Sequence, residues 1–183
     1  MRIKASGCIL STVFFLFAAV LNASSEQTSP FTGEINSEGI NIRSDSTTES
    51  QIICQIKKGA RVEVISELYD WYKIRLPKIA PSYVKKGLLE CVNYENTAGP
   101  GNYMQIPTNK RCLSAKASKD RINVRLKPNE SSVILGRLDK NEVANIVKEA
   151  GDWYRIEPIQ NSFGWINKKF VSKATEAQIK RRK

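Results

Sequence analysis

Few residues in this chain of 183 could carry catalytic chemistry. It has 4 cysteines and no histidine. Histidine commonly activates a nucleophilic cysteine and is the commonest zinc ligand, so its absence argues against a cysteine peptidase and a zinc site. The Asp and Glu residues lie in turn-like segments without the pattern of a general acid–base pair, although a glycosidase-type carboxylate pair stays open as a minor alternative. We therefore predict a protein that is not an enzyme and uses no cofactor or metal.

Aromatic side chains offer binding chemistry instead. In residues 71–75, the two-residue period of a β-strand places Tyr72 and Ile74 on one face and Trp71 on the other. Ile74 belongs in a core, so Trp71 should face outward, and Trp153 should do the same in a matching segment. An outward tryptophan can line a groove for an extended ligand. The alternative is that each tryptophan caps the open end of a small barrel, where every large apolar group is needed.

These segments belong to an internal repeat. The residues DWYKIR at 70–75 return 82 positions later as DWYRIE at 152–157, and INIR at 40–43 returns as INVR at 122–125. The offset holds without a gap over about sixty residues, which predicts two copies of one small domain. Short apolar runs separated by Gly, Pro and Asn indicate that each copy is a small antiparallel β-barrel or sandwich.

The second copy carries NVR at 123–125, DWY at 152–154 and GWI at 164–166. These pieces resemble the Asn-Val-Arg, Trp-Tyr-x-Val and Gly-Trp-Val hallmarks of the bacterial SH3-like (SH3b) domain family. The first copy departs from them where Ser82 and Tyr83 replace Gly and Trp. The resemblance covers both copies and implies an all-β chain of two tandem, small SH3-like β-barrels joined by a linker. It also implies an extracytoplasmic binding or targeting role, often toward peptidoglycan or its peptides.

The predicted organisation has six parts. They are a signal peptide at 1–25, a polar leader at 26–32, a first SH3-like domain at 33–90, a linker at 91–114, a second SH3-like domain at 115–172 and a basic tail at 173–183.

The N-terminus predicts export. Arg2 and Lys4 precede an apolar run from Ile9 to Leu21, and small residues follow. The run is too short to span a bilayer and fits a secretory signal, with an uncleaved anchor as the alternative. We expect cleavage near Glu26 and a periplasmic or secreted protein with no transmembrane segment in the mature chain.

The formal net charge is +11, and the excess of Lys and Arg lies mostly in the second copy and the tail. In an exported protein this basic end suggests an anionic polymer or a membrane surface as partner, or else a tail that only aids solubility. Nucleic acid is not expected, because the aromatic and basic motifs of RNA-binding modules are missing.

Three cysteines remain after the signal peptide. Cys91 directly follows the first copy and Cys112 directly precedes the second. A disulfide between them would close the linker and hold the two barrels together in an oxidising compartment. Cys54 is then a buried thiol, and the competing pairing is Cys54 with Cys91.

We expect the main ligand groove on the second copy, where three aromatic residues should meet beside the basic tail. The repeated arginines could hold a ligand carboxylate bidentately, although exposed strand arginines more often pair with a nearby Glu. The expected function is non-catalytic binding of peptidoglycan or its peptides, and the alternative is an envelope adaptor that binds a peptide segment of a partner protein. The expected ligand-binding residues are Trp153, Trp165, Phe170 and Arg125 on the second copy, with Trp71 and Tyr83 on the first.

Overall fold

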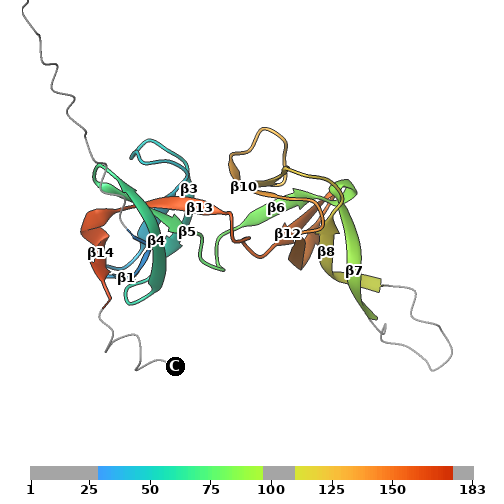
Figure 1. The fold of residues 1–183 in the computed structure, drawn as a ribbon, viewed down its shortest axis with the longest axis horizontal. Coiled ribbons are helices and arrows are strands. Elements are labelled where there is room, and N and C mark those ends of the chain that lie inside the picture. Colours follow the sequence, from blue (N-terminus) through green and yellow to red (C-terminus); the bar gives the residue numbers. More distant parts are fainter. Residues whose placement is uncertain (1–28, 97–109, 175–183) are drawn as a thin grey trace, which may run out of the picture.

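A computed structural model describes residues 29–96 and 110–174 of the chain. The expected signal peptide at 1–25, residues 97–109 of the expected linker and residues 175–183 of the expected tail lie outside the described residues. The described chain forms two seven-stranded antiparallel sheets with two short 3-10 turns (Figure 1). The predicted all-β class is confirmed.

The repeat that begins the chain supplies β1 (Phe31–Ile35), β2 (Ile40–Arg43), β3 (Ile52–Ile56), β4 (Arg61–Leu68), β5 (Trp71–Arg75), β6 (Ser82–Lys85), η1 (Lys86–Leu88) and β7 (Leu89–Asn96). The second repeat supplies β8 (Lys110–Ala117), β9 (Ile122–Arg125), β10 (Ile134–Leu138), β11 (Val143–Ala150), β12 (Trp153–Ile156), β13 (Phe163–Asn167), η2 (Lys168–Phe170) and β14 (Val171–Lys173).

The outer limits of the repeats need three corrections. β1 already begins at Phe31, within the expected leader, because Phe31 packs edge-on against the ring of Tyr72 at 5.5 Å. The end of β7 and the start of β8 pair with each other inside the expected linker. Lys173 belongs to β14, opposite Gly33 of β1, and not to a tail.

Local sequence explains the strands and their turns. In β2 the isoleucines Ile40 and Ile42 are buried while their polar neighbours are half-exposed, and β9 has the same pattern. This is the alternation expected of a strand with one face on a core. Gly59 and Asn141 occupy equivalent turns with φ angles of 76° and 67°. Glycine and asparagine tolerate this left-handed backbone better than other residues.

Each sheet contains strands of both repeats. The strand orders are β14-β1-β4-β5-β13-β2-β3 and β10-β9-β6-β12-β11-β8-β7. Barrel 1 therefore consists of β1 to β5 closed by β13, η2 and β14, and barrel 2 consists of β8 to β12 closed by β6, η1 and β7. Figure 1 shows β13 and β14 in orange and red among the blue and teal strands of the first repeat. The two repeats have exchanged their closing segments.

The exchange keeps the pairing register of the fold. In barrel 1, Trp165 of β13 lies opposite Lys73 of β5. In barrel 2, Tyr83 of β6 lies opposite Arg155 of β12. The 82-residue offset converts one pair into the other, so each closing segment takes the place of its counterpart.

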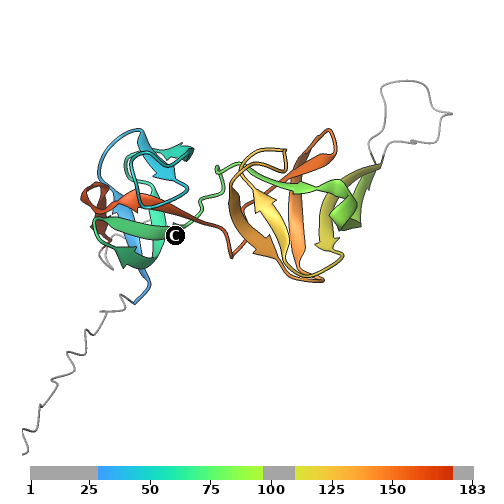
Figure 2. The same ribbon diagram turned by 90° about the horizontal axis from the view of Figure 1, so that it is seen from above.

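The expected division into barrels at 33–90 and 115–172 is consequently not what the structure contains. Barrel 1 is split between residues 31–75 and 163–173, and the strands of barrel 2 all lie between residues 82 and 156. Two crossover segments, residues 76–81 and 157–162, connect the barrels (Figure 2). They are joined by a hydrogen bond from the backbone N–H of Leu76 to the carbonyl of Ser162, at 3.0 Å.

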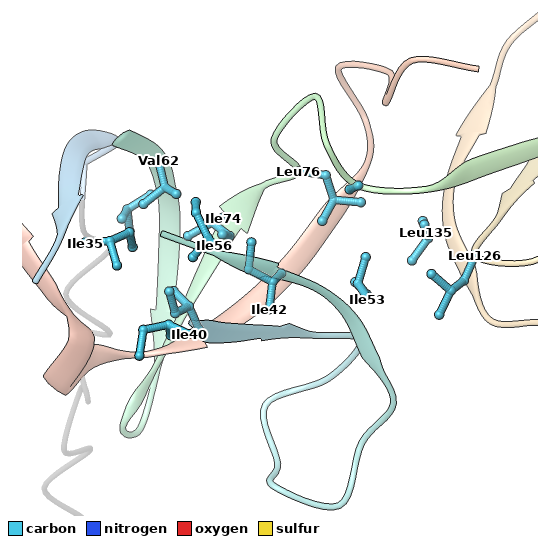
Figure 3. Packing of buried hydrophobic residues seen from close by; sticks show 13 residues of the cluster. Ile35, Ile40, Ile42, Ile53, Ile56, Val62, Ile74, Leu76, Leu126 and Leu135 are labelled. Atoms are coloured by element: carbon cyan, nitrogen blue, oxygen red, sulfur yellow. The ribbon is translucent and has the colours of Figure 1, made fainter. Parts of the chain in front are cut away.

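The cores mix the repeats in the same way. In barrel 1, Ile166 of the second repeat is fully buried with Ile42 and Ile74 of the first. This apolar cluster continues across the junction to Leu126 and Leu135 of barrel 2 (Figure 3). The core of barrel 2 contains Val84 of the first repeat beside a set from the second, among them Ile122, Val124, Leu138 and Ile156. Burial of these residues stabilises both barrels.

Candidate functional site

Barrel 1 carries a groove of about 260 Å³ at the junction of the two repeats. We call it groove 1. Its aromatic residues are Trp71 from the first repeat and Phe170 from the second, and its cationic residues are Arg43 and Lys169. The remaining lining residues are Gly39, Ile40, Asn41, Thr48 and Asn167.

The second repeat's side of groove 1 is held by polar contacts. Asn167 lies opposite Trp71 in the sheet and caps η2, where its side-chain oxygen accepts from the backbone N–H of Lys169 at 3.2 Å. From the first repeat, the Asn36 side chain donates to the carbonyl of Lys169 at 2.9 Å. These bonds fix the turn that carries Phe170. The groove is therefore positioned before any ligand arrives.

Arg43 is half-buried and holds a loop as well as lining the groove. Its Nη1 donates to the carbonyl of Ser50 at 2.7 Å. Arg125 repeats this bond with the carbonyl of Ser132 at 2.8 Å. Each arginine thus anchors the loop between the second and third strands of its repeat, β2–β3 or β9–β10, and its other N–H donors are the ones available to a ligand. The hydrogen-bonded partner is a backbone carbonyl, and the expected alternative of a nearby Glu is met only as a charge interaction, of Arg43 with Glu49 and of Arg125 with Glu130.

Barrel 2 has the equivalent groove, of about 180 Å³, which we call groove 2. The Nζ of Lys85 lies 2.6 Å from Oε1 of Glu130 inside it. This hydrogen bond lowers the pKa of the Glu130 carboxyl and raises the pKa of the Lys85 ammonium. The residues that line groove 2 are Lys85, Leu88, Asn123, Arg125, Glu130 and Trp153.

The two grooves differ in charge for a reason visible in the repeats. The positions of Lys85 and Glu130 are occupied in groove 1 by Asn167 and Thr48. Groove 2 therefore contains an internal ion pair beside its arginine. Groove 1 has Arg43 and Lys169 without a carboxylate among its lining residues, and is cationic.

The expected trio of Trp153, Trp165 and Phe170 is not brought together. Trp153 lines groove 2, whereas Phe170 lines groove 1. Trp165 stands in β13 of barrel 1, opposite Arg43 of β2. The reason is the exchange, which carries the segment with Trp165 and Phe170 away from Trp153 and toward Trp71.

The other expected site residues follow the same rule. Arg125 lines groove 2 with Trp153, and Tyr83 lies opposite Arg125 in the sheet. Trp71 lines groove 1. The more aromatic set therefore gathers on barrel 1 and not on the second copy as expected. Both Trp71 and Trp153 are half-buried.

Sequence reasoning missed Lys85, Glu130 and Lys169. Lys85 and Glu130 are 45 residues apart and meet only because β6 closes barrel 2. No periodicity connects them. Lys169 could have been noticed as a basic residue next to Phe170, and its Nζ lies 4.9 Å from the centre of that ring.

Cys91 and Cys112 are disulfide-bonded, which is the predicted pairing, and their Cα atoms are 5.9 Å apart. The expected role needs correction, however. The bond joins β7 and β8, two strands of barrel 2, and does not hold one barrel to the other. Cys54 is a free, half-buried thiol, and burial raises its pKa to about 11.

In residues 29–96 and 110–174, no group of three or more His, Cys, Asp or Glu side chains is placed to hold a metal ion. Within the same ranges, no helix has the length and apolar character needed to cross a membrane.

The chain is similar to a known domain family and to a curated protein. The family model described as bacterial SH3 domain matches residues 38–90 and 120–172. A Bacillus subtilis (strain 168) protein named "Putative N-acetylmuramoyl-L-alanine amidase YrvJ" is 22% identical over 167 residues. That alignment covers 90% of this chain and 29% of the relative. The chain thus spans less than a third of the relative's length.

Proposed function

This chain belongs to the bacterial SH3 domain family, and we propose that it is a non-catalytic envelope protein that recognises peptidoglycan or its peptides through groove 1. The family and the amidase-named relative support a peptidoglycan-related binding role. We further propose that the N-terminal segment exports the protein, so that the binding takes place outside the cytoplasm.

The observation that carries this proposal is the composition of groove 1. Trp71 and Phe170 supply aromatic surfaces, and Arg43 and Lys169 supply positive charge. Flat rings offer a large contact area to sugar or peptide faces at little cost in rotamer entropy. Wall peptides carry carboxylates, for which a guanidinium and an ammonium are suitable partners. One groove thus combines the two kinds of contact that such a ligand requires.

Groove 2 is the weaker candidate for the same ligand. A carboxylate entering it would meet Glu130 and would compete with that residue for Lys85. Placing two like charges side by side disfavours binding. We therefore assign carboxylate recognition to groove 1 and expect groove 2 to contribute little.

Sedimentation with purified peptidoglycan sacculi tests the proposal. Trp71→Ala and Phe170→Ala should each weaken binding by about 1–3 kcal/mol, as expected when a central aromatic contact is lost. Raising the salt concentration should weaken wild-type binding, because the cationic groups face solvent. The matched controls are Trp153→Ala in groove 2 and Tyr94→Ala, an exposed aromatic on β7 that lines neither groove.

Circular dichroism separates a binding defect from an unfolded barrel. If folded Trp71→Ala and Phe170→Ala proteins sediment with sacculi as wild type does, groove 1 is not the site. If wild type does not sediment with sacculi but captures one defined envelope protein, the adaptor role replaces wall binding.

A further inference from the structure

The strands of the two repeats allow a second arrangement, in which each repeat closes its own barrel. β6 on β12 and β13 on β5 use equivalent registers. β6 could therefore pair with β5, and β13 with β12, through the same ladder of backbone hydrogen bonds. Residues 76–81 and 157–162 would then be loops between neighbouring strands. We call this the self-closed arrangement.

The position of the disulfide distinguishes the two arrangements. In the structure β7 pairs with β8, and Cys91 lies opposite Ala115. In the self-closed arrangement β7 would take the place of β14 on β1, where Lys173 now faces Gly33. Cys91 would then face Gly33 in barrel 1, while Cys112 would stay on β8 in barrel 2. The two cysteines occupy neighbouring strands of one sheet only when the closing segments are exchanged.

We propose that the Cys91–Cys112 disulfide is a redox latch that selects the exchanged arrangement and so determines which residues meet in each groove. The latch itself follows from strand pairing. Its effect on ligand binding rests on the proposed function of groove 1.

The β7–β8 hairpin adds further contacts to the latched form. Beyond the cysteines, Glu95 pairs with Arg111 and Asn96 with Lys110. The side chains of Lys116 and Glu90 form an ion pair across the same two strands, at 3.0 Å. β1 and β14 pair at Gly33 with Lys173, and the backbone N–H of Ala174 donates to the carbonyl of Thr32 at 2.9 Å. The self-closed arrangement would separate the β7 and β8 residues that pair here.

Side-chain size also favours the exchange. A Cβ built at Gly164 would lie 2.6 Å from Cγ2 of Ile42 in barrel 1. Ser82, which would occupy that place in a self-closed barrel 1, has such a Cβ. In barrel 2 the counterpart of Ile42 is Val124, and there Ser82 is fully buried with its Cβ accommodated. The exchange thus places the glycine where barrel 1 has no room for a Cβ.

A second position shows the same complementarity. A Cβ built at Gly33 would lie 2.4 Å from Cγ1 of Val171. The equivalent of Gly33 in the second repeat is Ala115, whose Cβ would lie at that place against Val171 if β14 returned to its own repeat. Packed interiors tolerate such overlaps poorly. The latch therefore acts on a chain whose packing already prefers the exchanged form.

Closing the latch is a two-electron oxidation. Each thiol gives up one proton and one electron, the sulfur atoms form one bond, and a disulfide oxidant such as oxidised glutathione accepts the electrons and becomes two thiols. Reduction by a dithiol reverses the step. Oxidising extracytoplasmic compartments favour the closed latch.

The consequence for groove 1 is specific. In the exchanged form Trp71 meets Phe170 and Asn167. In the self-closed form the equivalent positions beside Trp71 would be Leu88 and Lys85. Reduction before folding would therefore replace an aromatic wall of the groove with an aliphatic one.

A cleavage experiment on the full mature chain reads the arrangement without any ligand. A protease recognition sequence is inserted within residues 97–109, and the folded protein is cut, reduced under native conditions and passed over a size-exclusion column. Exchanged halves should elute together, because each barrel contains strands of both. Self-closed halves should separate.

Wild type folded in the presence of oxidised glutathione should co-elute. Cys91→Ser/Cys112→Ser, unfolded and refolded, should raise the proportion of separated halves above that of oxidised wild type, because the self-closed arrangement then gives up no disulfide. Cys54→Ser is the matched control and should behave as wild type. Ser82→Gly/Gly164→Ser leaves the cysteines intact, reverses the size match and should increase separation after refolding in reductant.

Two results would overturn the latch. One is separation of oxidised wild-type halves on reduction, since these halves would never have been exchanged. The other is equal co-elution of wild type and the double-serine variant, both folded by circular dichroism. If that variant does not fold, wild type refolded in reductant and then cut provides the same comparison. If the halves behave as expected while Trp71→Ala binds sacculi normally, the latch stands and the proposed function of groove 1 fails.

Discussion

Lys168 of the second repeat forms an ion pair with Glu67 of the first, with 3.1 Å between Nζ and Oε2. The 82-residue offset converts this pair into Lys86 and Glu149, which are bonded in barrel 2. Each lysine also lies over a tyrosine ring of the repeat that it joins, at 5.3 Å in barrel 1 and 5.2 Å in barrel 2. Partly exposed pairs add little stability. They do show that equivalent side-chain pairs form in both barrels despite the exchange, as equivalent backbone pairs do.

Removing a buried isoleucine should destabilise the barrel in which its side chain packs, even though that barrel consists mostly of the other repeat. Ile166→Ala should cost about 2–5 kcal/mol of unfolding free energy through lost contacts and a cavity. Because Ile166 is buried with Ile42 and Ile74, amide hydrogen exchange should quicken in β2 and β5 of the first repeat. Ile156→Ala, also in the second repeat, is the matched control and should quicken exchange in β9. Faster exchange in β9 for Ile166→Ala would contradict the exchanged core.

A methyl group added at Gly164 should destabilise barrel 1. Its Cβ would lie 2.6 Å from Ile42 Cγ2 and 2.9 Å from Leu76 Cδ2. Overpacking of this kind typically costs about 1–3 kcal/mol. Urea unfolding monitored by circular dichroism measures the loss. Gly87→Ala is the control, because no atom lies within 4 Å of a Cβ built there. Equal stability of the two variants would show that β13 does not pack as described.

The Lys85–Glu130 pair should make the melting temperature depend on pH at both ends of the range. The pKa of Glu130 is lowered on folding by the hydrogen bond from Lys85. Its contribution is therefore present above the unfolded value of about 4.3 and is lost as pH falls through the folded value. The pKa of Lys85 is raised by the same bond, so its contribution is present below the unfolded value of about 10.4 and is lost as pH rises further.

Thermal melts of Glu130→Gln should lose these two components of the pH dependence. Glu95→Gln, near the end of β7, is the control and should keep both. A Glu130→Gln profile that coincides with wild type across acid and alkaline pH would mean that the pair does not form in solution.

Cys54 should react slowly with a disulfide reagent in the folded protein. Burial raises its pKa from 9.0 to about 11, which lowers the thiolate fraction at pH 8 about 100-fold, and the thiolate is the nucleophile. The colour released from Ellman's reagent measures the rate, and urea should raise it sharply. Cys54→Ser should abolish the reaction of the non-reduced mature chain. Equally fast reaction with and without urea would show an accessible thiol at position 54.

Much of the local structure could be predicted from alternation and turn residues. Tyr72 and Ile74 face the core of barrel 1, as period two requires. The repeat offset was also informative, because the family matches at 38–90 and 120–172 fall within the expected copies. The cysteine positions at the inner edges of the copies identified the correct disulfide partners.

The exchange could not be predicted from these signals, because the repeat itself conceals it. The segments that lead into β6 and β13, residues 76–81 and 157–162, have the same length. Both strands also show the same alternation, so either fits beside β5. The distinguishing information lies in small differences of size, such as Gly164 against Ser82 and Gly33 against Ala115. Those differences indicate which strand fits only when the opposing side chains are known. The misplaced groove followed directly, since Trp153 and Trp165 share a repeat but not a barrel.

The division of barrel 1 between the two ends of the chain also sets an order in time. Barrel 1 begins at Phe31 and receives its last strand at Lys173, whereas every strand of barrel 2 lies between residues 82 and 156. As the polypeptide emerges from the ribosome or the membrane, barrel 2 can close while the edges of β5 and β2 are still unpaired, because β13 has not yet emerged. Unpaired edges of this kind are sites of aggregation in incomplete chains. Although its first strand is made first, barrel 1 is the last part of the protein to be finished.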